Sequence, residues 1–393
     1  MDVFKKCYEF TRADEAKKAG LYPYFTEIEK VDGNHVWVNG KKILMVGSNN
    51  YLGLFDDPRI KESAMAAVKQ YGTSTCGSRF LNGTYSLHVE LERKLAHFMG
   101  KEEALTFSTG MQTNLGAISA LASRDDVIIL DRKVHASIMD AVRLSYAHIA
   151  KYKHNDMKDL EDKLAHQPED KGKLIIVDGV FSMEGDLSNL PKIVKLAKKY
   201  NARLMVDDAH GVGVMGEKGR GTSEHFGLIN EVDLVMTTFS KSFASLGGFV
   251  VGDSKIIQYI KHHARALIFS ASITPAALGA AQKALEIIQT EPWRRKRLWE
   301  ITRIMNTELT AMGYHTGNTE TPIIPVFIND LEKTFMLWNF LRDFGIFTNP
   351  VIAPAVPPED SLIRTSFTAT HTDNDLEFIL KGFKQGGKAL GLF

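Results

Sequence analysis

The chain has 393 residues, of which 44% are hydrophobic and 24% charged, which is typical of a globular protein with room for a large core and a second, smaller domain. A formal net charge of +1 excludes the strong charge that recruits nucleic acid or an anionic membrane. Its two cysteines, Cys7 and Cys76, provide no disulfide framework and no metal-ligand spacing, and no apolar run approaches the ~20 residues that cross a bilayer. We therefore expect a cytoplasmic protein without a signal sequence or metal, with at most peripheral contact with the inner membrane.

The N-terminal region, residues 1–55, is predicted to form a charged arm and a hairpin. Residues 1–20 are charged and permit helix, and His35–Val46 alternates around Asn39-Gly40, a pair typical of tight turns.

A large domain is predicted over residues 56–290. Short apolar runs alternate there with helical patterns such as Leu187–Tyr200, which indicates a mostly parallel sheet covered on both faces. The predicted strands are Ala104–Phe107, Val127–Leu130, Leu174–Val177, Arg203–Val206, Leu234–Thr237 and Gly248–Val251.

A small C-terminal domain is predicted over residues 291–393. One or two long helices between Pro275 and about Met312 lead into it. The remaining predicted elements are a strand at Ile323–Ile328, a helix at Lys333–Phe344, a strand at Leu362–Phe367 and a last helix from Asn374. The order of elements indicates an α/β protein with a large mostly parallel sheet domain and a small α+β domain.

Two side chains that follow separate apolar runs are the basis for predicting the chemistry of this protein. Asp207 lies in Val206–His210, and Lys241 lies in Thr237–Ser242. A lysine amine can form a Schiff base with the aldehyde of pyridoxal phosphate, and an aspartate can keep the pyridine nitrogen protonated so that the ring accepts electrons from a carbanion. Each residue alone is more often structural, but the pair in this order indicates a pyridoxal phosphate site.

Two nearby features support that prediction. Ser108–Met111 follows a predicted strand and opens a helix, so its backbone N–H groups can bind a phosphate with help from the helix dipole. His210 lies three residues after Asp207. Alone, either feature has an ordinary structural explanation.

Three other motifs are set aside. Gly211–Gly216 has dinucleotide-fingerprint spacing, but it runs into a loop where that motif must open a helix. Arg294–Arg297 is interpreted as a solvated helix face, with contact to acidic partners or coenzyme A as the alternative. The adjacent His262 and His263 point in different directions on a helix, which argues against a metal site.

With these residues in place, the chain resembles the α-oxoamine synthases, fold type I pyridoxal phosphate enzymes that condense an amino acid with an acyl-CoA and release CO2. The resemblance covers nearly the whole chain. Its motifs are Gly47–Leu54, Gly77–Thr84, His88–Glu92, Asp131–Ser137, Asp178–Asp186, Val206–Gly213, Thr238–Ser242 and Ile363–His371.

Within this family the chain is most similar to the bacterial, homodimeric serine palmitoyltransferases. The segments that carry this closer resemblance are Gly72–Phe80, Ser245–Asp253 and Asn349–Pro357. The resemblance implies a fold type I transferase whose large sheet is of the seven-stranded type.

The resemblance also implies roles for individual residues. Lys241 would be the Schiff-base lysine and, with His135, catalytic, while His135 would stack on the cofactor ring. Asp207 would pair with the pyridinium nitrogen, and His210, supported by Ser182, would bind the phenolic oxygen of the ring.

The remaining implied roles concern the phosphate and the substrate. Gly110, Met111 and Thr238 would bind the phosphate, and Ser272 would reach the phosphate of the neighbouring subunit, which makes a dimer necessary. Met111 replaces the small aliphatic or aromatic residue usual there, with no expected loss because its backbone N–H would bind. Arg364 would bind the substrate carboxylate near Asn49.

The expected reaction joins L-serine and palmitoyl-CoA into 3-oxosphinganine, coenzyme A and CO2. Two alternatives stay open: a sister enzyme that uses glycine or L-alanine with another acyl-CoA, and a non-catalytic partner subunit. Such a subunit would be expected to lack the Schiff-base lysine. The acyl-chain length and the choice between coenzyme A and an acyl carrier protein are also open.

Overall fold

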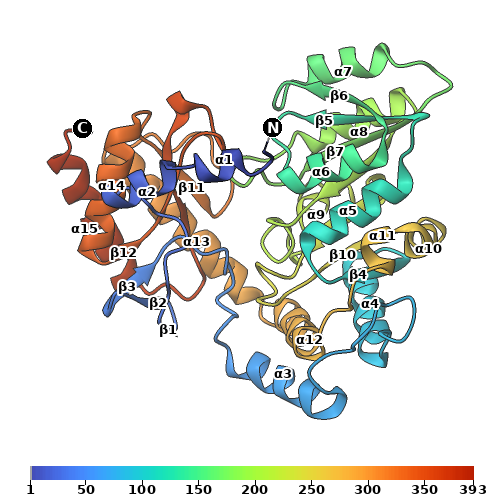
Figure 1. Cartoon of the computed structure of the whole chain (residues 1–393), viewed down its shortest axis with the longest axis horizontal. Helices are drawn as coiled ribbons and strands as arrows, with labels where there is room; N and C mark the ends of the chain where they lie inside the picture. Colours follow the sequence, from blue (N-terminus) through green and yellow to red (C-terminus); the bar gives the residue numbers. More distant parts are fainter. Residues whose placement is uncertain (1) are drawn as a thin grey trace.

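The computed structural model describes residues 2–393, which form a larger and a smaller part joined by the long helix α13 (Pro292–Ala311) (Figure 1). The larger part is built on a seven-stranded sheet in the order β4-β10-β9-β8-β7-β5-β6. Its strands are β4 (Glu103–Phe107), β5 (Asp126–Asp131), β6 (His148–Tyr152), β7 (Gly172–Asp178), β8 (Arg203–Asp207), β9 (Leu234–Thr238) and β10 (Gly248–Gly252). The sheet is parallel from β6 through β9, and β10 runs antiparallel to both of its neighbours.

Both faces of this sheet are covered by helices, as the short apolar strands predicted. One face packs against α5 (Gly110–Leu121), α6 (Ala136–Ser145), α10 (Ser254–His263) and α11 (Arg265–Ile268). The other face packs against α4 (Ser86–Met99), α7 (Met157–Ala165), α8 (Leu190–Lys199) and α12 (Pro275–Thr290). Helix α3 (Pro58–Tyr71) packs against α12, and two short helices, α9 (Thr222–His225) and η1 (Ile229–Glu231), follow β8.

The six predicted strands are confirmed, but β6 was not predicted. β6 lies at the edge of the sheet, and only Tyr152 of its five residues is buried. An edge strand that faces solvent needs no apolar run, so periodicity gave no signal for it.

The smaller part contains a three-stranded antiparallel sheet in the order β11-β14-β13. Its elements are β11 (Ile323–Phe327), α14 (Leu331–Phe344), β13 (Asn349–Val351), η2 (Pro358–Asp360), β14 (Leu362–Ser366) and α15 (Asp373–Ala389). Helices α12 and α13 meet at Glu291, beside the boundary predicted at residue 290.

The predicted hairpin is confirmed and belongs to a second small sheet. Strands β1 (Lys30–Asp32), β2 (His35–Val38) and β3 (Lys41–Met45) pair in order, and β3 pairs in parallel with β12 (Ile346–Phe347) of the C-terminal part. Asn39 and Gly40 both have positive φ, as a two-residue turn of this kind requires. The chain that leaves the hairpin begins beside β14, because the Ser366 N–H donates to the Val46 carbonyl at 2.8 Å.

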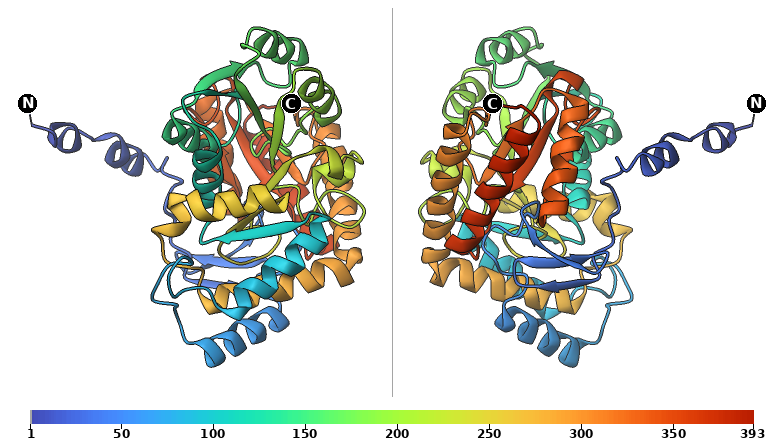
Figure 2. Two further views of the ribbon diagram at one scale, coloured as in Figure 1. Left: turned by 90° about the vertical axis from the view of Figure 1, so that its right-hand side faces the viewer. Right: turned by 90° about the vertical axis from the view of Figure 1, so that its left-hand side faces the viewer.

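The N-terminal arm projects away from the body of the molecule (Figure 2). It contains α1 (Lys5–Tyr8) and α2 (Arg12–Lys18), neither of which has a buried residue.

The interpretation of Arg294–Arg297 as a solvated helix face is wrong for its first two residues. Arg294 and Arg295 are each 7% exposed. Arg294 donates to the Leu52 carbonyl at 3.0 Å and to Asp57 at 3.1 Å, and Arg295 donates to the Ile288 carbonyl at 2.9 Å. Because α13 begins against the end of α12, these guanidinium groups reach backbone carbonyls that would otherwise be buried without partners.

Candidate active site

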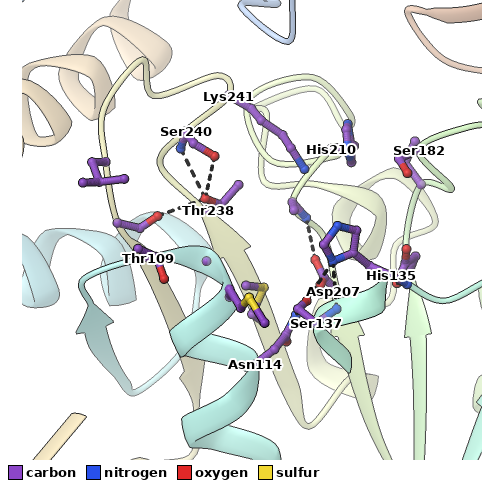
Figure 3. A pocket seen from close by; sticks show the side chains of 18 residues that line it. Thr109, Asn114, His135, Ser137, Ser182, Asp207, His210, Thr238, Ser240 and Lys241 are labelled. Carbon is purple, nitrogen blue, oxygen red and sulfur yellow. Dashed lines mark hydrogen bonds between the residues drawn. The ribbon is translucent and has the colours of Figure 1, made fainter. Parts of the chain in front are cut away.

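Lys241 and Asp207 lie at the carboxyl ends of two adjacent parallel strands. Asp207 is the last residue of β8, and Lys241 follows three residues after β9. Both side chains line a cavity of about 270 Å³ at this edge of the sheet, and Lys241 extends toward the side that holds Asp207 and His135 (Figure 3). The carboxyl edge of a parallel sheet is where such folds bind ligands.

The amine of Lys241 is buried and has a lowered pKa. Burial lowers its pKa to about 8, Asp207 opposes the shift, and Arg364 adds to it. Within residues 2–393, no hydrogen bond or ion pair involves Lys241 Nζ. A lysine with this pKa is partly a neutral nucleophile and base near physiological pH.

Asp207 is paired in register with a second buried acid, Asp178, at the end of β7. Burial, and then the charge of Asp207, raise the pKa of Asp178 well above its usual range. Asn114 of α5 donates to Asp207 Oδ2 at 2.8 Å, and the Ala209 N–H donates to Oδ1 at 3.1 Å. Asp207 is thus hydrogen-bonded and faces the cavity. Asp178 and Asn114 also line the cavity and were not predicted.

His135 caps α6 and faces the cavity. Its Nδ1 accepts from the Ser137 N–H at 3.3 Å, as an N-cap does, and lies 2.8 Å from Ser137 Oγ. Burial lowers the pKa of His135, Asp207 opposes this, and Lys241 lowers it further. The predicted neighbourhood of His135, Asp207 and Lys241 is therefore present.

The first turn of α5 forms a cradle at the opposite end of the cavity. Thr109 caps the helix, and Gly110, Met111, Thr238 and Ser240 line the cavity beside it. A Cβ on Gly110 would lie only 2.8 Å from Thr238 Oγ1, so only glycine leaves this space open. Free N–H groups at a helix N-terminus next to hydroxyl groups suit a phosphate.

His210 lines the cavity from the segment after β8 and is bound to Tyr51, which the sequence did not single out. Tyr51 Oη lies 2.7 Å from His210 Nδ1. Burial raises the pKa of Tyr51 to about 12 and lowers that of His210 well below its usual value. Tyr51 falls inside the motif Gly47–Leu54, but nothing local in the sequence indicated that its hydroxyl reaches His210.

Arg364 lies just beyond the cavity wall and is joined to it through Ser182. Its Nε donates to the Ser182 carbonyl at 2.7 Å, Nη1 to Ser366 Oγ at 2.8 Å, and Nη2 to Asn49 Oδ1 at 3.0 Å. Ser182 lines the cavity, and Arg364 is only 6% exposed. No carboxylate of residues 2–393 pairs with this buried cation. A buried guanidinium without an anionic partner is suited to bind an anionic ligand.

Ser272 is the one predicted cofactor residue that lies apart from the cavity of its own chain. It is 8% exposed, packs against Gly83, and its hydroxyl has no hydrogen-bond partner among the described residues. Its role toward a neighbouring subunit stays a prediction.

The dinucleotide and metal alternatives gain no support from the geometry. Gly211–Gly216 forms turns after β8, and the next helix, α9, begins only at Thr222. His262 and His263 each bond to a backbone carbonyl of their own helix, and residues 2–393 contain no cluster of three or more metal-ligating side chains.

A protein-family model described as aminotransferase class I and II matches residues 41–383. The chain belongs to this family. Curated relatives include the serine palmitoyltransferases of Sphingobacterium spiritivorum, 53% identical over 96% of this chain and 95% of the relative, and of Bacteroides thetaiotaomicron, 55% identical over 93% and 94%. The 8-amino-7-oxononanoate synthase of Thermosipho melanesiensis is 44% identical over 96% and 97%. The predicted α-oxoamine synthase family is therefore confirmed.

Solved structures agree with this family. A serine palmitoyltransferase of Sphingomonas wittichii matches with a TM-score of 0.97 and 37% identity, covering all of both chains. One from S. paucimobilis, solved with bound pyridoxal phosphate and myriocin, matches with a TM-score of 0.96 and 34% identity over all of both chains. The predicted fold type I architecture is confirmed.

The cofactor of this aminotransferase-family protein is pyridoxal phosphate, as predicted. The residues present fit that group on structural grounds. The cavity offers a lysine amine without a partner among residues 2–393, a buried aspartate, and a glycine-lined helix N-terminus at its opposite end. These are the partners that an aldehyde, a pyridine nitrogen and a phosphate each require.

Proposed function

We propose that this protein is a serine palmitoyltransferase, which condenses L-serine with palmitoyl-CoA to give 3-oxosphinganine, coenzyme A and CO2. The observation that carries the proposal is the 53–55% identity to serine palmitoyltransferases over more than nine-tenths of the chain. The 8-amino-7-oxononanoate synthases, which also match over nearly the whole chain, are 41–44% identical.

Four groups of residues would hold the cofactor. The Lys241 amine would bind its aldehyde and Asp207 its pyridine nitrogen. His210, supported by Ser182, would bind the phenolic oxygen, and Gly110, Met111 and Thr238 the phosphate. When bound, pyridoxal phosphate supplies a ring that takes up electron density from the α-carbon of an attached amino acid.

The substrate end would be built around Arg364. Its guanidinium would pair with the serine carboxylate, with Asn49 beside it, because Arg364 is buried, cationic and has no carboxylate partner among residues 2–393. His135, which lines the same cavity, would contact the reacting atoms.

Lys241 would move the proton that starts the reaction. Lys241 Nζ would act as the base, because an amine with a pKa near 8 suits removal of the serine α-proton. The α-carbon of serine would then bond to the thioester carbonyl, with coenzyme A leaving as the thiolate, the carboxylate leaving as CO2 and a proton returning to the same carbon.

The active unit would be a homodimer with shared sites. Ser272 has a buried hydroxyl without a partner among the described residues and does not line the cavity of its own chain. In the proposed dimer this hydroxyl would contact the phosphate of the second subunit. The acyl donor is taken to be acyl-CoA. No helix within residues 2–393 has the length and apolar character to span a membrane.

The non-catalytic alternative has no structural support, because Lys241, Asp207 and His210 are all present and line one cavity. The experiment that tests the proposal incubates cofactor-loaded protein with palmitoyl-CoA and, in parallel, L-serine, glycine or L-alanine. Mass spectrometry should find 3-oxosphinganine from serine alone. Product from glycine or alanine instead would identify a sister enzyme with the same mechanism.

A further inference from the structure

A chain of hydrogen bonds connects Asp207 to His135 through two side chains with no assigned role. Asn114 Nδ2 donates to Asp207 Oδ2 at 2.8 Å and to Ser137 Oγ at 2.9 Å, and Ser137 Oγ lies 2.8 Å from His135 Nδ1 (Figure 3). Asn114 is 1% exposed and Ser137 is 3% exposed. Both line the cavity, so the chain of bonds runs along its floor.

The direction of each bond is fixed by chemistry. A carboxylate only accepts, so the Asn114 amide must present its NH2 group to Asp207. The opposite amide orientation would set Oδ1 against the carboxylate oxygen. In the observed orientation Asn114 Oδ1 is buried without a hydrogen-bond partner among residues 2–393. The orientation of the amide is therefore set by the two bonds that its NH2 group donates.

The same logic fixes the protonation of His135. Ser137 Oγ accepts from Asn114, which leaves its own hydrogen free to donate to His135 Nδ1. The Ser137 backbone N–H, which can only donate, also points to Nδ1 at 3.3 Å. Nδ1 is therefore an acceptor without a proton, and the single proton of a neutral ring must sit on Nε2.

We propose that Asn114 and Ser137 are positioning residues that hold His135 as the neutral Nε2–H tautomer and so keep a hydrogen-bond donor available to substrate oxygen in the cavity. The tautomer follows from the contacts alone. Its use by the substrate, as a donor to the serine carboxylate or the thioester carbonyl oxygen, rests on the proposed function.

Local structure explains how the two residues reach these places. Asn114 follows Gly110 by four residues on α5, so one helix presents the phosphate cradle at its end and Asn114 one turn later. Ser137 lies in the first turn of α6, two residues after its N-cap His135. Asp207 ends β8, so the chain of bonds joins two helices to the central sheet.

The first test needs no variant. Histidine-selective ¹⁵N NMR of the apoprotein at pH 8 reports the tautomer of each neutral ring, and the His135 signal is identified as the one lost in His135→Gln. We expect an Nε2–H pattern for His135. An Nδ1–H pattern, or a charged ring at this pH, would overturn the proposal.

The second test uses variants with matched controls. Ser137→Ala should move the His135 signals toward a mixture of tautomers, and Ser137→Thr, which keeps the hydroxyl, should restore them. Ser145→Ala removes another buried hydroxyl from the same helix, one bonded only to the nearby Val142 carbonyl and Ala147 N–H, and should leave the His135 signals unchanged. Identical His135 spectra for Ser137→Ala and wild type would contradict the role of Ser137.

Kinetics provide the third test. Asn114→Ala and Ser137→Ala should each lower kcat about 10–100-fold with little change in the KM for serine, since each removes part of the same hydrogen-bond chain. The double variant should be little worse than the worse single variant, whereas multiplied losses would show that the two residues act independently. If the tautomer is as expected but serine and palmitoyl-CoA give no product, the proposed function fails, and the positioning of His135 by Asn114 and Ser137 stands.

Discussion

Tyr51 hydrogen-bonds to His210 at 2.7 Å across 159 residues of sequence. Both side chains are buried, and the pKa shifts of both favour their neutral forms. Tyr51 Oη also lies 3.4 Å from Asn49 Oδ1, which accepts from Arg364. Tyr51 therefore connects the residue expected at the cofactor oxygen with the residues expected at the substrate carboxylate.

Replacing Tyr51 with Phe should weaken cofactor binding about 5–20-fold, since it removes one buried hydrogen bond of His210, which is about 1–2 kcal/mol. Titration of the apoprotein with pyridoxal phosphate, followed by absorbance, measures this. Tyr152→Phe is the matched control: Tyr152 is also fully buried, but its hydroxyl has no partner among the described residues. Equal affinities for Tyr51→Phe and Tyr152→Phe would contradict the role of Tyr51.

Replacing Lys241 with Ala should abolish turnover, by at least about 1000-fold, because the side chain is both the proposed covalent attachment point and the proposed base. Circular dichroism and gel filtration should be unchanged, since no hydrogen bond or ion pair of residues 2–393 depends on Lys241 Nζ. Lys255→Ala, on an exposed site of α10, serves as the control. Full activity in Lys241→Ala would refute the whole arrangement of the site.

Replacing Arg364 with Lys keeps the positive charge but loses the planar fork that reaches Ser182, Ser366 and Asn49. We expect the Kd for L-serine to rise about 10–100-fold, which corresponds to one or two charge-assisted hydrogen bonds, with palmitoyl-CoA binding little changed. Spectral titration with L-serine reports the Kd. The control variant Arg342→Lys, at a half-buried arginine of α14, should bind serine like wild type. An unchanged Kd in Arg364→Lys would place the carboxylate site elsewhere.

Site residues at or just after the ends of strands were identified from the sequence. Site residues that meet only through tertiary packing were missed. Asp207 and Lys241 were found because parallel strands end at one edge, so strand assignment alone brings them together. Tyr51 and Asn114 were missed because their partners, His210 and Asp207, lie 159 and 93 residues away. Arg294 and Arg295 were misjudged for the same reason, since they donate to the carbonyls of Leu52 and Glu217, which lie 242 and 78 residues away.

A histidine bridge outside the cavity gives a pH-dependent prediction. His154 contacts Asp131 through Nδ1 at 3.0 Å and Asp186 through Nε2 at 2.9 Å. Burial alone would lower its pKa, but the hydrogen bonds to the two carboxylates outweigh burial and raise the pKa to about 9. Asp131 begins the segment that carries His135, and Asp186 ends the segment that carries Ser182, so the imidazolium joins two loops of the site.

Because the folded pKa lies above the unfolded value of 6.5, the stabilising effect of His154 is complete below pH 6.5 and is lost as pH rises through about 9. His154→Gln should therefore lower stability by about 1–2 kcal/mol at pH 6, after allowance for partial solvent screening, and by much less at pH 9.5. Thermal unfolding of apoprotein at both pH values measures this. His166→Gln, at an exposed histidine of α7's C-cap, controls for loss of a ring. A His154→Gln deficit that is equal at both pH values would mean that packing, rather than the charge bridge, makes the contribution.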